Sequence, residues 1–184
     1  MEIKQLRAYS RAEMQLVGEF GYISDQKFEV SKDETLNKVT INISLKHLDT
    51  PYKKKEMNEE DDHERYSKLV SLGYSLALYV GNEPAAIAIT EPQDWNNTLL
   101  IWHFQVAEHH KRKSYGKKLM SKLEEVAREN GCRAITLETQ NTNAPAIRFY
   151  QSCGFEIEGV DLSFYTNHDV EAGEVALFMK KKLL

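Results

Sequence analysis

A short basic turn is the first part of the sequence that points to chemistry. Lys111, Arg112 and Lys113 stand directly before Ser114-Tyr115-Gly116, where a strand-like pattern gives way to a helix-like one. The first N–H groups of a helix have no partner within the helix, and the helix dipole is positive at that end. Such a turn is suited to hold a diphosphate, and the basic side chains add positive charge to it. The same residues also fit a helix start that simply faces solvent.

Three more pieces follow the turn and fit one another. Glu138 is an acidic residue near the end of an otherwise apolar strand pattern. Asn143 precedes Ala144-Pro145, which is typical of an N-cap with proline in the first turn of a helix. The helix pattern then carries Phe149-Tyr150 and ends at Gly154.

Metal chemistry and disulfides have little support in this sequence. His109 and His110 are adjacent, but no third ligand lies at a useful spacing, so we expect two surface histidines and no metal. Cys132 and Cys153 lack a pairing pattern, and we expect two free thiols of the kind found in cytosolic proteins.

Composition limits the class of protein. The chain has 184 residues, with 24 Lys and Arg against 28 Asp and Glu, so its net charge is −4. A compact nucleic-acid-binding domain usually carries a basic excess, and this class is disfavoured. The first ten residues lack the apolar core of a signal peptide, and no apolar run reaches the roughly 18 residues of a membrane span. We therefore expect a cytoplasmic protein with no membrane partner.

The elements that position these residues are of both kinds. Residues 74–106 predict a three-strand meander with a turn at Gly81-Asn82. A helix is expected over residues 114–130, because its apolar residues form one stripe and Asn130-Gly131 ends it. The further elements expected in this half are strands at 134–139, 155–160 and 174–179, and a helix from residue 144 to 150.

The N-terminal part is expected to be rich in strands. Residues 1–8 predict a strand and residues 9–20 a short helix. Strands follow at 27–31 and 38–48; in the second, one apolar face has the period of a half-buried strand, formed by Val39, Ile41, Ile43 and Leu45. Residues 52–68 predict a polar helix or loop. The order of elements indicates an α/β architecture with a mixed sheet.

The run from Leu137 to Phe155 resembles the second half of the GNAT superfamily of acetyl-CoA-dependent N-acetyltransferases, which carries an Asn, a small residue and a Phe-Tyr-x₃-Gly-Phe-like ending at this spacing. The family's Arg/Gln-x-x-Gly-x-Gly/Ala turn matches Lys111, Arg112, Lys113, Ser114, Tyr115 and Gly116. Lys111 replaces the usual Gln or Arg, and Ser114 replaces a Gly. The Cβ of Ser114 stands where the backbone approaches phosphate, so cofactor affinity is expected to be affected. The resemblance implies a mixed, mostly antiparallel sheet flanked by helices and splayed at the cofactor strand.

A narrower resemblance extends over most of the chain. Its pieces are Pro51-Tyr52-Lys53, Asp94-Trp95-Asn96, Leu137-Glu138-Thr139-Gln140 and a Val160-Asp-x-x-x-Tyr-x-Asn167 run. Together they resemble the streptothricin acetyltransferases, which acetylate a β-lysine amine of that antibiotic. That branch usually carries acidic residues in the strand before the cofactor turn, whereas this chain has Trp102-His103-Phe104-Gln105-Val106 there.

The resemblance implies a role for each candidate residue. Tyr150 matches the family's general acid, which protonates the leaving thiolate. An amine of pKa about 10.4 needs a base, and Glu138, acting through water, is favoured; some relatives that acetylate protein N-termini use a Glu at this strand position. His103 is the second candidate, because imidazole titrates near neutral pH. Each of the three also has a purely structural alternative.

Cofactor contacts follow from the same resemblance. The backbone N–H of Phe104 or Val106 would donate to the developing oxyanion, and Asn143 and Tyr150 would border the pantetheine arm. The acidic run Glu59, Glu60, Asp61 and Asp62 either draws in a cationic amine or is a solvated surface.

Three classes of function remain open at this point. The first is an acetyl-CoA-dependent N-acetyltransferase acting on a streptothricin-like antibiotic, a polyamine, or a protein N-terminus or lysine. The second is a non-catalytic acyl-CoA-binding sensor, and the third is a protein-interaction subunit. We expect a single domain over 1–184, with 1–73 on the acceptor side and 74–184 as the acetyl-CoA-binding core; homodimers are common in the family.

Overall fold

The computed structural model describes residues 1–18, 20–56 and 60–183. The chain forms two compact units that alternate along the sequence. Unit 1 contains Met1–Phe20, Lys55–Leu137 and Lys181–Leu184, and unit 2 contains Gly21–Lys54 and Glu138–Lys180. The expected division of function between residues 1–73 and 74–184 stays a prediction.

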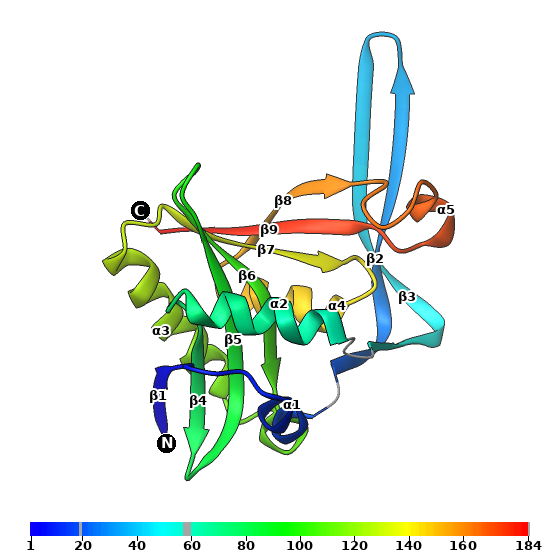
Figure 1. Ribbon diagram of the computed structural model, residues 1–184. Coiled ribbons are helices and arrows are strands. Elements are labelled where there is room, and N and C mark those ends of the chain that lie inside the picture. The colour runs from blue at the N-terminus through cyan, green and yellow to red at the C-terminus, as the bar shows by residue number, and fades with distance from the viewer. Residues whose placement is uncertain (19, 57–59, 184) are drawn as a thin grey trace. The chain divides into compact units, whose positions relative to one another are not determined.

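Unit 1 is built on a sheet with the strand order β1-β4-β5-β6-β7 (Figure 1). The pairs are antiparallel except β6 with β7, which is parallel. The expected meander is confirmed, and the turn between its first two strands contains Gly81 at φ 64°. The strands are β1 (Glu2–Gln5), β4 (Leu76–Val80), β5 (Glu83–Gln93), β6 (Thr98–Val106) and β7 (Ala134–Gln140).

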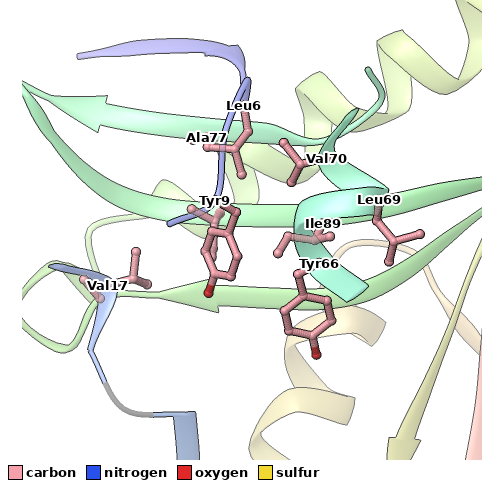
Figure 2. Close-up of a cluster of buried hydrophobic side chains, with 10 residues drawn as sticks. Leu6, Tyr9, Val17, Tyr66, Leu69, Val70, Ala77 and Ile89 are labelled. Carbon is pink, nitrogen blue, oxygen red and sulfur yellow. The ribbon is translucent and has the colours of Figure 1, made fainter. Parts of the chain in front are cut away.

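The helices of unit 1 bury the apolar side chains that recur along one face of each helix. In α3 (Tyr115–Glu129) the expected stripe is buried at Leu119, Met120, Leu123 and Ala127. A second buried cluster involves two further helices. Val17 comes from α1 (Arg11–Val17), and α2 (Glu60–Ser71) contributes Tyr66, Leu69 and Val70. Figure 2 shows this cluster, in which the Tyr9 and Tyr66 rings meet edge to face at 6.0 Å. Burial of one such aliphatic side chain stabilises the fold by about 1.5–3 kcal/mol.

Unit 2 combines the end of β7 with β9, β8, two helices and a long hairpin. The strands neighbour in the order β7-β9-β8, and β8 (Glu156–Asp161) runs antiparallel to β9 (Ala176–Lys182). The helices are α4 (Ala144–Ser152) and the short α5 (Asp169–Ala172), which was not expected from the sequence. The hairpin of β2 (Phe20–Thr35) and β3 (Lys38–Glu56) is a separate two-stranded sheet (Figure 1).

Buried Asn141 fastens the hairpin to the rest of unit 2. Its side-chain N–H donates to the carbonyl of Phe28 at 2.8 Å, and its carbonyl oxygen accepts from the N–H of Val175 at 2.8 Å. Its backbone N–H and C=O bond to the same two residues, each at 2.9 Å. One side chain thus joins β2 to the segment that leads into β9.

Two expectations for the hairpin are wrong. Pro51–Glu56 continues β3, and the helix after it begins at Glu60, where a single polar helix or loop over 52–68 was expected. Of the four residues of the apolar face of β3, three are exposed, namely Val39 (55% exposed), Ile41 and Leu45, and Ile43 is half-buried. Alternation fixes which side chains share a face, but a two-stranded ribbon has no second layer to cover that face.

Candidate active site

The end of β6 in unit 1 has a strand partner on one side. Pairing with β7 runs from Thr98 to Ile101, whereas pairing with β5 continues to Val106. A register shift at Ile89/Thr90 leaves Trp102 as an extra residue, which is a β-bulge. Phe104 and Val106, the two expected backbone donors, lie on this stretch and are half-buried.

The basic turn after β6 has the backbone of an anion-binding turn. Arg112 and Ser114 are both left-handed, with φ 60° and 61°. Ser114 is the N-cap of α3 without a capping bond from its side chain, and its carbonyl accepts the N–H of Lys118 at 3.1 Å. The N–H groups before Lys118 in α3 therefore point out of the helix end, where a nest of this kind holds phosphate oxygens. Lys111 is also paired with Glu108 at 2.5 Å, and both side chains are well exposed, so the pair is weak.

His110, which we expected on the surface, is buried beside this turn. It belongs to the short 3₁₀ helix η1 (Glu108–His110), is 9% exposed, and its ring lies 5.5 Å from that of Tyr115. Its Nδ1 has no hydrogen-bond partner among the residues that the structure describes. Burial and the neighbouring His109 and Lys113 lower the pKa of His110, so the ring is neutral at pH 7. Within the described ranges there is no group of three His, Cys, Asp or Glu side chains suited to a metal ion.

His103 is buried within unit 1. It is 5% exposed and lies between the rings of Phe20 and Tyr66, at 4.8 and 5.4 Å. Its Nε2 is 3.1 Å from Oε1 of Gln105, whose Nε2 donates to the carbonyl of Gly18 at 2.9 Å. A carbonyl only accepts, so the Gln105 amide is oriented, and Nε2 of His103 must be the donor. A base function of His103 would have to use Nδ1.

In unit 2, Tyr150 has the properties of a proton donor. It lies on α4, which Asn143 caps by accepting the N–H of Ala146 at 3.2 Å. Tyr150 is 8% exposed and packs between the rings of Phe149 and Phe155, at 5.4 and 5.7 Å. Burial, followed by the charges of Cys153 and Glu138, raises the pKa of Tyr150 well above its usual range. The phenol therefore keeps its proton at neutral pH.

Glu138 lies near the carboxyl end of β7 and is half-buried. Its Oε1 accepts a hydrogen bond from the hydroxyl of Tyr165. Burial and this bond to Glu138 raise the pKa of Tyr165, so the tyrosine is the donor of the pair. Within unit 2, Glu138 thus faces one tyrosine through a hydrogen bond and acts on Tyr150 through its charge.

Three tyrosines in this region were not among the expected site residues. Tyr165 and Tyr52 lie in segments of the narrower resemblance, which was the available signal for them. Tyr22 lies in β2 and had no signal. Its hydroxyl donates to Oε1 of Gln140 at 2.7 Å, and its ring stacks on Tyr52 with centroids 5.9 Å apart.

The acidic run is only partly described. Glu59 lies outside the described residues. Glu60, Asp61 and Asp62 form the first turn of α2. Its role toward an acceptor stays a prediction.

The comparisons with known proteins agree with this architecture. The model of the acetyltransferase (GNAT) family matches residues 42–155, and the chain belongs to this family. It is 36% identical to a streptothricin acetyltransferase of Streptomyces lavendulae over 104 residues, which cover 56% of this chain and 54% of that protein. It is 34% identical to streptothricin acetyltransferase A of Bacillus subtilis (strain 168) over 119 residues, 65% of this chain and 68% of that protein. The match to the Streptomyces protein thus spans about half of its length.

Solved structures show the same fold. The crystal structure of nourseothricin acetyltransferase matches all of this chain and 98% of its own, with a TM-score of 0.75 and 24% identity. A Bacillus anthracis protein solved in complex with acetyl coenzyme A matches 88% of this chain and 86% of its own, with a TM-score of 0.69 and 23% identity. The expected mixed, mostly antiparallel sheet is confirmed. In the part of the chain that the structure describes, no helix is long and apolar enough to cross a membrane.

Proposed function

We propose that the protein is an acetyl-CoA-dependent N-acetyltransferase that modifies a primary amine of a small cationic molecule, such as a streptothricin-like antibiotic. Membership of the GNAT family and the names of the two relatives support this proposal. The observation that carries it is Tyr150, a buried phenol that stays protonated. The half-buried carboxylate of Glu138 lies in the same unit, and its charge is one of the causes that raise the pKa of Tyr150. A general acid and a general base are the two groups that acetyl transfer to an amine requires.

The reaction assigns a task to each group. The amine nitrogen bonds to the acetyl carbonyl carbon while the carbon–sulfur bond breaks. The amine gives a proton to Glu138, through water, and the leaving thiolate takes one from Tyr150. His103 is the less favoured base, because its Nε2 already donates to Gln105.

The resemblance to the family implies which residues would contact acetyl-CoA. In unit 1, Lys111, Arg112, Lys113, the Ser114-Tyr115-Gly116 stretch and the first N–H groups of α3 would hold the diphosphate. The N–H of Phe104 or Val106 would donate to the oxyanion. In unit 2, Asn143 and Tyr150 would border the pantetheine arm.

A thiol-release assay tests the proposal. The protein is incubated with acetyl-CoA and a panel of a streptothricin, polyamines and peptides, and free thiol is followed; thermal shift with acetyl-CoA is recorded in parallel. We expect stabilisation by acetyl-CoA and release that depends on the streptothricin. Thiol release with polyamines or peptides, but not with the streptothricin, would show that the acceptor belongs to one of those classes. Stabilisation by acetyl-CoA without thiol release would indicate an acyl-CoA sensor. A cytoplasmic location and a homodimer stay predictions.

A further inference from the structure

The β-bulge of β6, in unit 1, determines which way the end of that strand faces. Ile89 of β5 pairs with His103 and Thr90 pairs with Ile101, so Trp102 is the extra residue. If Trp102 paired with Ile89 instead, every later residue of β6 would shift by one position. Such a shift turns each side chain to the other face of the sheet, and each backbone N–H to the other edge of the strand.

The observed register directs the N–H groups of Phe104 and Val106 away from β5. Ala107 donates its N–H to the carbonyl of Ala85 at 3.0 Å, so the backbone of Ala107 faces β5. The direction alternates along a strand, and residues 106 and 104 therefore face the opposite edge. On that edge β6 last pairs with β7 at Ile101. Donation to a group outside the β5–β6 pair requires this direction of the two N–H groups.

Two elements hold the side chain of Trp102. Its indole N–H donates to Oε2 of Glu91, on β5, at 2.7 Å. A carboxylate acceptor makes a bond of this kind stronger than one between neutral groups. Cζ of Arg65, on α2, lies 4.8 Å from the centre of the indole ring, a distance at which a cation and an aromatic face attract. We call Glu91, Trp102 and Arg65 the bulge clamp.

The residue after Trp102 is held by the same helix. The ring of His103 lies 5.4 Å from that of Tyr66, which follows Arg65 on α2. Tyr66 belongs to the buried cluster that also contains Ile89, the residue opposite the bulge (Figure 2). Trp102 and His103 thus both face α2, whereas successive side chains of a regular strand point to opposite faces. The bulge is therefore fixed by contacts with α2 as well as with β5.

We infer that Trp102 is a positioning residue for acetyl transfer: the bulge clamp holds the register in which the N–H of Phe104 or Val106 can donate to the oxyanion. The inference rests on the proposed function for the reaction, but the clamp itself can be measured without turnover. Trp102 acts through the backbone that follows it and has no contact of its own with the reacting atoms.

Variants of Trp102 test the inference by thiol release. Trp102→Phe keeps a ring beside Arg65 and removes the N–H that bonds to Glu91, and Trp102→Leu removes both contacts. We expect Trp102→Leu to lower kcat about ten- to hundred-fold, because a small misplacement of a catalytic group costs that much. The KM for acetyl-CoA should stay within about three-fold, because ground-state binding is not altered. Trp102→Phe should lower kcat less.

Trp95→Leu is the matched control in unit 1. Trp95 is 83% exposed, and its indole N–H also donates to a side chain of β5, Oε1 of Gln93, at 3.3 Å. Because Trp95 lies outside the bulge, its replacement should leave kcat unchanged. Thermal unfolding of each variant shows that it is folded.

Replacements of Glu91 separate the hydrogen bond from the ring. Glu91→Gln keeps an oxygen that can accept the indole N–H, and Glu91→Leu does not. Glu91→Leu should lower kcat as Trp102→Phe does, and Glu91→Gln should retain most of it. A role in stability alone would lower Tm without this division between kcat and KM.

Amide hydrogen exchange at Ala107 measures the register without any substrate, because this N–H bonds to Ala85. Trp102→Leu should speed the exchange at least about ten-fold, and Trp95→Leu should not. Equal kcat in Trp102→Leu and Trp95→Leu, equal loss in the two Glu91 variants, or unchanged exchange at Ala107 would overturn the inference. If the unmodified protein releases no thiol with any amine, the proposed function fails and the role in transfer with it, whereas faster exchange in Trp102→Leu would still establish the clamp.

Discussion

The hydroxyl of Tyr165 donates a hydrogen bond to Oε1 of Glu138, although the two residues are 27 positions apart. Tyr165 is held for this contact by its backbone: its N–H donates to Oδ2 of Asp169 at 2.8 Å. The N–H and hydroxyl of Thr166 both donate to the other oxygen of Asp169 at 2.7 Å. The buried carboxylate at the start of α5 thus positions the tyrosine that bonds to the proposed base.

Tyr165→Phe should move the acid limb of the pH–rate profile. The hydroxyl stabilises the charged form of Glu138, and a carboxylate that loses such a donor ionises at higher pH. We expect the acid limb of kcat/KM to shift upward, while the ring and its packing are kept. The profile is measured by thiol release across pH 5–9. A profile that matches the unmodified protein would show that Tyr165 does not act through Glu138.

Tyr150→Phe should abolish turnover while acetyl-CoA still binds. Loss of a general acid typically costs 10²–10⁴-fold in rate. Because the pKa of Tyr150 is raised, no decline in rate from its ionisation is expected below about pH 10. Kcat is compared with the thermal shift produced by acetyl-CoA, and Tyr74→Phe serves as the control. Unchanged kcat in Tyr150→Phe would remove this residue from the mechanism.

Local signals in the sequence were sufficient for α3 and α4. The apolar stripe of α3 and the cap at Asn143 depend on residues within one or two helical turns, and both are present in the structure. The contact between Tyr22 and Gln140 had no such signal, because the two residues are 118 positions apart. Contacts of this kind depend on how strands are arranged, which a single sequence does not specify.

Burial was harder to predict than secondary structure. Val39, Ile41 and Leu45 alternate as a half-buried strand does, but they are exposed because the hairpin has only two strands. His110 was expected on the surface next to the basic turn, yet it packs against Tyr115. For the hairpin the pattern predicted the strand correctly, and in both cases the exposure depended on which other segments pack against the residue.

Ser114→Gly should stabilise the cofactor turn. Ser114 is left-handed with φ 61°, which costs a residue with a Cβ about 1 kcal/mol relative to glycine. For a chain of this length that corresponds to a rise of about 2–4 °C in Tm. Removal of the Cβ should also tighten acetyl-CoA binding several-fold, measured by calorimetry.

Ser114→Ala is the matched control, because it removes the hydroxyl and keeps the Cβ. It should leave Tm and acetyl-CoA affinity close to those of the unmodified protein. Should Ser114→Ala and Ser114→Gly behave alike, the strain at this position would be negligible and the hydroxyl would account for any change.

Asp169→Asn should destabilise the loop that carries Tyr165, in a way that depends on pH. Burial alone would raise the pKa of Asp169, but hydrogen bonds from Tyr165, Thr166 and Phe164 outweigh it and lower the pKa. A depressed pKa in the folded state means that the charged carboxylate stabilises the fold above about pH 4, and that this contribution is lost as pH falls further.

At pH 7 we expect Asp169→Asn to lower Tm by roughly 2–10 °C. The difference between the two proteins should shrink as pH falls from 4 to 2.5. Asp161→Asn is the control and should cost less, because the Asp161 carboxylate accepts from the exposed N–H of Ser163 and an amide oxygen can still accept that bond. A difference in Tm that stays constant from pH 7 to pH 2.5 would mean that the charge of Asp169 does not hold the loop.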